Sequence, residues 1–184
     1  PPYADDLDGY ALILAPGVLT LSDPLKAAMS RSDAHVILGP RTNAKTADLA
    51  IPVPLPPALD AIDATVARVE TLREDMPLPV ENGGHVKLWF EHVETTESVI
   101  EATDAGAPVF LQAGRHFYLA GWPDEVCLDR VLTHAAVAAG LAPQALPQDI
   151  RIRDTGKRRF IFNHGPHRVH YDGHDLPPAG VVWT

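Results

Sequence analysis

The residues best suited to chemistry lie in the loop Gly39-Pro40-Arg41-Thr42-Asn43-Ala44-Lys45, which follows a short apolar run. In α/β proteins, the loop that leaves the carboxyl end of a strand often carries a nucleophile or binds a phosphate. This loop offers Thr42 but neither Cys nor Ser. Residues 41–45 also lack the glycines that let backbone N–H groups approach a phosphate. We therefore expect Arg41 and Lys45 to serve neither a phosphate nor a nucleophile.

The single cysteine, Cys127, is a poor candidate for catalysis. Catalytic cysteines of glutaminase-like folds lie on a tight turn between a strand and a helix. Cys127 instead falls in the first turns of an amphipathic helix, between Val126 and Leu128, and this position predicts a core side chain. With one cysteine, no internal disulfide can form and cysteine-based zinc patterns are absent.

Four histidines between residues 164 and 174 lie near Asp172 and Asp175 and raise the question of a metal site. Three or four ligands would have to converge at about 2 Å from the ion. On a strand His164 and His170 could share a face, but His167 would point away unless a turn intervenes. We expect exposed turn histidines, no metal site and no cofactor.

Paired carboxylates, which glycoside hydrolysis needs at a set separation, are not marked by any local pattern among the 24 acidic residues. The segment Val80–Gly84 places Glu81 before Asn82 and two glycines, which indicates a turn. The residues alone therefore predict a chain with no assembled active site.

The composition is that of an ordinary globular protein, with 46% hydrophobic and 21% charged residues in 184. No apolar run approaches the roughly 20 residues of a membrane span. The net charge of −9 argues against nucleic acid as a partner, and the basic cluster at 151–159 has the alternating pattern of a solvated sheet face. A start without Met suggests a piece of a longer chain, and the lone cysteine suggests a cytoplasmic protein.

The elements that must position these residues follow from periodicity. Continuous apolar runs at 10–16 and 34–39 predict two buried strands, joined by a helix that Ser22 caps. Segments 64–73 and 85–94 alternate as half-exposed antiparallel strands do, and three short strands follow. A second helix is predicted over 123–141, closed by Gly140.

The character of the chain changes after residue 148. Segment 149–165 predicts a β-hairpin with its turn at 154–157, and further short strands follow. We expect two domains: an α/β domain at 1–148 and a small all-β antiparallel domain at 149–184.

Four segments, "LGPRTNAKTADLAIPVPLPP", "VKLWFEHVE", "FYLAGWPDE" and "RRFIFNHG", resemble in order and spacing the C-terminal part of family 42 bacterial β-galactosidases. That family has a catalytic (β/α)8 barrel, then a flavodoxin-like trimerisation domain, then a small β domain. The middle domain is similar to class I glutamine amidotransferases without their nucleophile. The resemblance covers essentially the whole chain.

The resemblance implies that both catalytic glutamates lie upstream in a barrel absent from this chain. The family's acid/base carboxylate directly follows an Asn, and no Asn-Glu pair occurs here, so no catalytic residue carries over. The family's Arg-Ser/Thr-Gly-x-Lys loop is matched by Arg41, Thr42, Asn43 and Lys45. Asn43 replaces the glycine, which is tolerable because Asn accepts a positive φ.

These patterns lead to a hypothesis in which the loop at 41–45 is an assembly element. It would order the proline-rich segment after it and reach the barrel of the same polypeptide or a neighbouring subunit of a homotrimer. Two alternatives stay open: a stand-alone amidotransferase-like enzyme, and a carbohydrate-binding accessory module that uses Trp89, Trp122 or Trp183.

Overall fold

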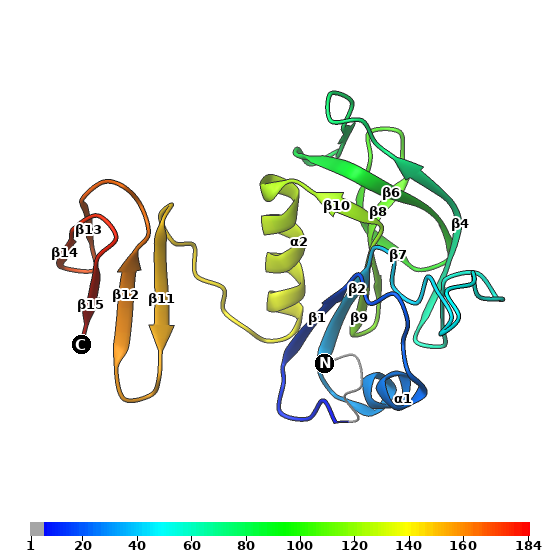
Figure 1. The fold of residues 1–184 in the computed structure, drawn as a ribbon, viewed down its shortest axis with the longest axis horizontal. Helices are drawn as coiled ribbons and strands as arrows, with labels where there is room; N and C mark the ends of the chain where they lie inside the picture. Colours follow the sequence, from blue (N-terminus) through cyan, green and yellow to red (C-terminus); the bar gives the residue numbers. More distant parts are fainter. Residues whose placement is uncertain (1–5) are drawn as a thin grey trace. The chain divides into compact units, whose positions relative to one another are not determined.

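The computed structural model describes residues 6–184 of the chain. The chain divides into two compact units, unit 1 at Pro1–Pro143 and unit 2 at Gln144–Thr184. Each unit has a hydrophobic core of its own, and the course of the chain through both is shown in Figure 1.

The first sheet of unit 1 contains the two strands that apolar runs predicted. β1 at Leu12–Pro16 and β2 at His35–Gly39 pair in parallel, and helix α1 at Asp23–Arg31 connects them. Ser22 caps α1, since its side chain accepts a hydrogen bond from Leu25 N. In the sheet order β1-β2-β9-β8-β7, β9 runs parallel to β2, whereas the remaining pairs are antiparallel. The last three strands are β7 at Ser98–Ala102, β8 at Pro108–Ala113 and β9 at His116–Leu119.

The second sheet of unit 1 is antiparallel throughout, in the order β10-β6-β4-β3 with β5 paired to β6. Its two long strands are the segments whose alternating pattern predicted half-exposed strands. The second of them breaks the alternation at Leu88, which has a φ of 63° and is exposed. The strands are β3 at Pro57–Leu59, β4 at Ile62–Thr71, β5 at Leu78–Pro79, β6 at His85–Thr95 and β10 at Gly121–Pro123.

Side chains from both sheets and both helices form the core of unit 1. Helix α2 at Glu125–Ala138 packs against β2, β6 and β10 (Figure 1). It begins at an Asp124 cap. It is followed by Gly140 at a φ of 72°, where its sequence predicted the helix to end. The largest fully buried side chains of this core are Tyr118, Phe90, Phe110 and Phe117.

Unit 2 contains the predicted hairpin, in which β11 at Ile150–Asp154 pairs antiparallel with β12 at Arg159–Asn163. β15 at Val181–Trp183 pairs with the other edge of β12. A second hairpin joins β13 at Val169–Tyr171 and β14 at His174–Leu176. The core of unit 2 contains only three buried hydrophobic side chains, Ile150, Ile161 and Leu176.

The expectation of an α/β, flavodoxin-like or amidotransferase-like fold is wrong. The structure is mostly β, with 42% strand and 13% helix, and the described residues form only two helices. One β-α-β unit is present, but the strands after β2 return mainly through antiparallel hairpins without helices between them. The apolar pattern of two parallel strands does not tell whether the later strands of the sheet are also joined by crossover helices. Those strands lie far along the chain, so their connections cannot be deduced from the first pair.

Candidate functional site

The loop at residues 39–45 begins where β2 ends, and a glycine is required at its first position. Gly39 has a φ of 118°, and a Cβ built on it would lie 2.1 Å from the backbone oxygen of Leu119 on β9. β2 and β9 therefore approach each other at a point that only glycine allows. Gly17 N donates to the carbonyls of Gly39 and Pro40, which joins the ends of β1 and β2.

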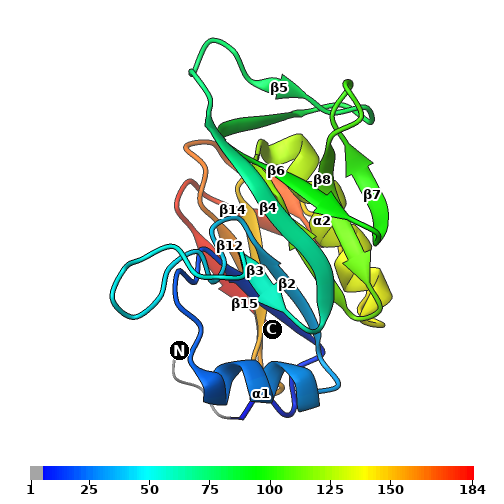
Figure 2. The ribbon, with the colours of Figure 1, turned by 90° about the vertical axis from the view of Figure 1, so that its right-hand side faces the viewer.

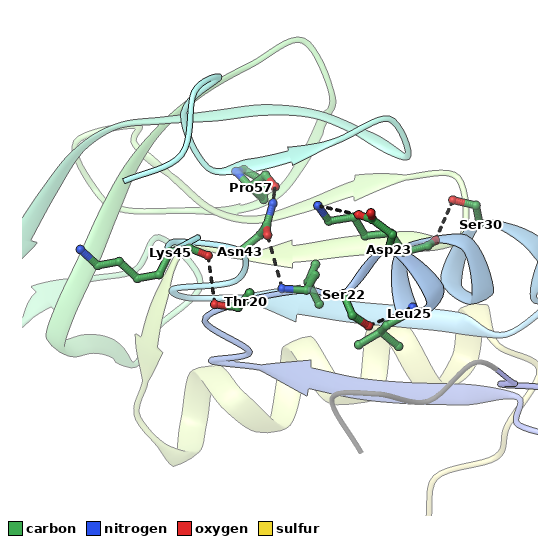
Figure 3. A network of polar contacts seen from close by, with 10 residues as sticks. Thr20, Ser22, Asp23, Leu25, Ser30, Asn43, Lys45 and Pro57 are labelled. Atoms are coloured by element: carbon green, nitrogen blue, oxygen red, sulfur yellow. Dashed lines mark hydrogen bonds and ion pairs between the residues drawn. The ribbon is translucent and has the colours of Figure 1, made fainter. Parts of the chain in front are cut away.

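Thr42 and Asn43 point inward and hold the loop. Thr42 is fully buried, and its hydroxyl accepts from Gly39 N at 2.8 Å and donates to Gly39 O at 2.9 Å. Asn43 Nδ2 donates to Pro57 O at 2.8 Å, and its Oδ1 accepts from Leu21 N at 3.4 Å (Figure 3). Asn43 has a φ of 50°, the positive value expected where the related pattern has glycine. Asn43 thus ties the loop to the start of β3, at the end of the proline-rich segment.

Arg41 and Lys45 point outward. The backbone of Lys45 is bonded to Leu19 O and Thr20 Oγ1, whereas its side chain extends away from that network (Figure 3). The guanidinium of Arg41 lies 5.1 Å from the ring centre of Trp89, a cation–π distance. Within residues 6–184, neither side-chain cation has an ion-pair or hydrogen-bond partner. The four loop residues therefore divide into two anchors and two unpaired cations.

A buried carboxylate, Glu91 on β6, fixes the backbone of Arg41. Glu91 is 2% exposed, and its Oε1 accepts from Arg41 N at 2.8 Å and from Trp89 Nε1 at 3.2 Å. Its Oε2 accepts from the hydroxyl of Tyr118 at 2.6 Å. Burial, followed by the nearby charge and hydrogen bond of Glu91, raises the pKa of Tyr118 well above its usual value. Three donors thus hold Glu91 in place, and Arg41 keeps its φ of 68°.

A hollow of about 310 Å³ opens between the loop and the second sheet. Its wall is mostly apolar, and three cations, Arg41, Lys45 and Arg68, lie on its lining. Arg68 differs from the other two because its guanidinium contacts His92 at 2.7 Å and lies 3.8 Å from Glu70. The apolar lining includes Leu19, Ile51, Leu55, Val66, Val69 and Trp89.

The other candidate residues are not gathered into a site. Cys127 is fully buried, and burial raises the pKa of its thiol to about 11, so it is not a thiolate at neutral pH. Of the clustered histidines, His170 pairs with Asp175 at 2.9 Å and His164 stacks on Phe162. Over residues 6–184, no three His, Cys, Asp or Glu side chains lie close enough to hold a metal ion.

Sequence reasoning missed Glu91. Its only signal in the sequence is an acidic residue between the apolar Phe90 and Val93 of β6. The irregularity at Leu88 shifts the alternation of inward and outward side chains along this strand. Neither its burial nor its three donors can be deduced from that spacing, since Arg41 and Tyr118 lie on other strands and loops.

Several solved structures that are similar to this chain are β-galactosidases. The crystal structure of the enzyme from the psychrophilic Marinomonas ef1 matches 100% of this chain with a TM-score of 0.93 and 29% identity, over 30% of that protein. The enzyme from the Antarctic haloarchaeon Halorubrum lacusprofundi matches with a TM-score of 0.87 at 24% identity, which supports the fold alone.

The family is shown by sequence. The model of the β-galactosidase trimerisation domain matches residues 2–142, and the chain belongs to this family. A β-galactosidase of Thermus thermophilus is 34% identical over 175 residues, and BgaA of a Thermus species is 36% identical over the same length. The chain spans 27% of the length of either relative. The resemblance to family 42 β-galactosidases is thus confirmed.

Proposed function

We propose that this chain assembles and supports a β-galactosidase as its non-catalytic part. The catalytic (β/α)8 barrel would lie elsewhere in the same polypeptide, and the whole enzyme would be a homotrimer that hydrolyses terminal β-D-galactosides with retention of configuration. The match of residues 2–142 to the trimerisation domain carries this proposal. The β-galactosidases that contain this fold extend well beyond it, since it covers 30% of the Marinomonas chain.

The internal chemistry supports a role without catalysis. Among residues 6–184, Glu91 is the one carboxylate on the lining of the hollow, and donors from Arg41, Trp89 and Tyr118 already occupy its oxygens. The only thiol is buried in the core and protonated. By contrast, the backbones of Arg41 and Lys45 are held by hydrogen bonds, while their charged groups have no ion-pair partner within residues 6–184, as suits a surface that another chain completes.

No helix among residues 6–184 is long and apolar enough to cross a membrane. We place the assembled enzyme in the cytoplasm, a location supported by the single unpaired cysteine.

The test is to express the full-length polypeptide and this 184-residue chain side by side. We expect the full-length protein to sediment as a trimer and to hydrolyse a chromogenic β-galactoside, whereas the isolated chain hydrolyses none. A full-length protein that stays monomeric at micromolar concentration would contradict the assembly role. Hydrolysis of the substrate by the isolated chain would contradict the proposal that this chain is non-catalytic.

A second candidate function, sugar binding, is favoured by one observation in unit 2. Trp183 is 57% exposed, and its ring centre lies 6.4 Å from that of Phe160 on the neighbouring strand. Exposed aromatic faces present apolar surface to a ligand. Titration of the chain with galactose or lactose should then change its tryptophan fluorescence, and Trp183→Ala should abolish the change. An unaltered spectrum at saturating sugar would remove this candidate.

A further inference from the structure

The segment between β2 and β3 stands out from the body of unit 1 (Figure 2). It also exposes apolar side chains. Val53 is 95% exposed, Leu49 69% and Ile51 64%. Single exposed apolar residues are common, but three within residues 49–53 form a patch that water solvates poorly. The patch therefore points to a surface that something covers in the assembled protein.

The tip of this segment has a fixed shape. Thr46 N donates to Ala50 O at 2.9 Å, Leu49 N donates to Thr46 O at 2.9 Å, and Ala50 N donates to the Thr46 hydroxyl at 3.1 Å. The resulting turn presents Asp48 and Leu49 side by side, both exposed. Within the described residues Asp48 has no ion-pair partner. A rigid turn loses little conformational entropy on docking, so it is suited to insert into another surface.

The hollow beside Trp89 has the complementary properties. It is apolar inside, and the unpaired cations Arg41 and Lys45 lie on its lining. An occupant that combines an apolar side chain with a carboxylate would fill the hollow and pair with these cations. The Asp48–Leu49 turn has this combination, but it belongs to the same loop that forms the hollow's edge. The turn can therefore occupy only the hollow of a different copy of the chain.

We infer that the turn at 46–50, with Val53, docks into the Arg41–Trp89 hollow of the next copy around a three-fold axis. Each copy then donates its turn to one neighbour and receives the turn of the other, which is a heterologous contact that closes into a ring. Because the turn and the hollow lie close together in one copy, the contact has to lie next to the axis, where the 120° rotation moves each patch only a short distance. This inference rests on the proposed trimer and names the surface that holds it together.

The first test measures trimer dissociation of the full-length polypeptide by mass photometry and sedimentation, with melting temperature as the check on folding. Val53→Asp removes an apolar contact and should weaken assembly by about tenfold to a hundredfold. The matched control is Val99→Asp, an exposed valine on β7 that lines no part of the hollow. Equal weakening by both variants, or a Val53→Asp protein that remains as tightly trimeric as the parent, overturns the inference.

Charge reversal tests the pairing directly. Lys45→Glu and Asp48→Lys should each weaken the trimer by about tenfold, and the double variant should recover most of the loss. Additive losses in the double variant overturn the pairing.

A covalent test does not depend on equilibrium constants. Copies carrying Leu49→Cys and copies carrying Ala44→Cys are mixed, allowed to exchange and oxidised. A disulfide-linked dimer should form in the mixture, because Ala44 lines the hollow and Cys127 is buried. Failure to cross-link in a mixture that is still trimeric would show that the hollow holds something else, such as the rest of the same polypeptide. If the unmutated protein is no trimer at all, the proposed function itself fails.

Discussion

Unit 1 and unit 2 each bury an asparagine that ties loops together, yet the cores around these two side chains differ greatly. Asn43 lies beside a core of two sheets and two helices. Asn163 is 1% exposed, and its amide donates to His167 O and Pro177 O and accepts from Gly165 N, in a unit whose core contains three buried hydrophobic side chains.

The contrast shows how one kind of interaction has different weight in different surroundings. A domain with a small core buries little apolar surface, so each polar tie is a large share of its stability. In unit 1 the hydrogen bonds of Asn43 fix the conformation of one loop, whereas the large core already stabilises the rest of the unit. We therefore expect loss of Asn163 to act on all of unit 2 and loss of Asn43 to act locally.

The largest effect expected is that of Gly39→Ala, which shows what is required to break the better-packed unit. The added Cβ would clash with the Leu119 backbone at a φ of 118°, so β2 and β9 would have to separate. We expect unit 1 to lose about 4 kcal/mol. Hydrogen exchange, measured peptide by peptide, should show lost protection across β1, β2 and β9. Retention of parental exchange rates in these strands would mean that the close approach is not needed.

The paired variants Asn163→Ala and Asn43→Ala test the comparison itself. Asn163→Ala removes the side-chain hydrogen bonds to His167 O, Pro177 O and the buried Gly165 N, at a cost of about 3 kcal/mol, and should expose all of unit 2 to exchange. Asn43→Ala should raise exchange only near residues 40–57. If Asn163→Ala raises exchange only near residue 163, as Asn43→Ala is expected to do near residue 43, the size of the core does not determine how far the loss of a buried asparagine spreads.

The smallest effect expected concerns pH and is confined to unit 1. His116 is buried with Nε2 unpartnered, and burial, with the nearby charges of Arg115 and His35, lowers its pKa below the usual value. The unfolded chain then binds a proton more readily than the folded one, so stability is complete above about pH 6.5 and falls as pH decreases toward the folded pKa. Chemical denaturation at several pH values should show this slope, and His116→Asn should flatten it. A slope unchanged in that variant would assign the pH dependence to other groups.

Local patterns were sufficient to predict most elements of the structure. The two buried strands, the Ser22 cap, the long second helix and the C-terminal hairpin are all present, although the hairpin's turn lies at 155–158, one residue later than predicted. Alternation correctly indicated β4 and β6. The overall class was misjudged because one parallel pair was extended to a whole α/β sheet, although residues 57–123 contain no helix.

The candidate site was predictable only in part. The loop's position after a strand followed from the apolar run before it, and the positive φ of Asn43 was expected from the glycine that the related pattern has at this position. The role of Glu91 did not, because its donors come from residues 41, 89 and 118, which the fold brings together. The hollow could not be predicted either, since its wall combines four separate stretches of the chain, at residue 19 and within residues 41–56, 66–69 and 89–91.

The division of the loop into inward anchors and outward cations has a consequence for the evolution of such enzymes. Thr42 and Asn43 secure the backbone, whereas Arg41 and Lys45 face outward, so the second pair can change without disturbing the first. Two paralogues expressed in one cell could keep the same scaffold and diverge only at the outward positions. Each paralogue would then assemble only with copies of itself, because a few charge substitutions at the outward positions would disfavour mixed oligomers.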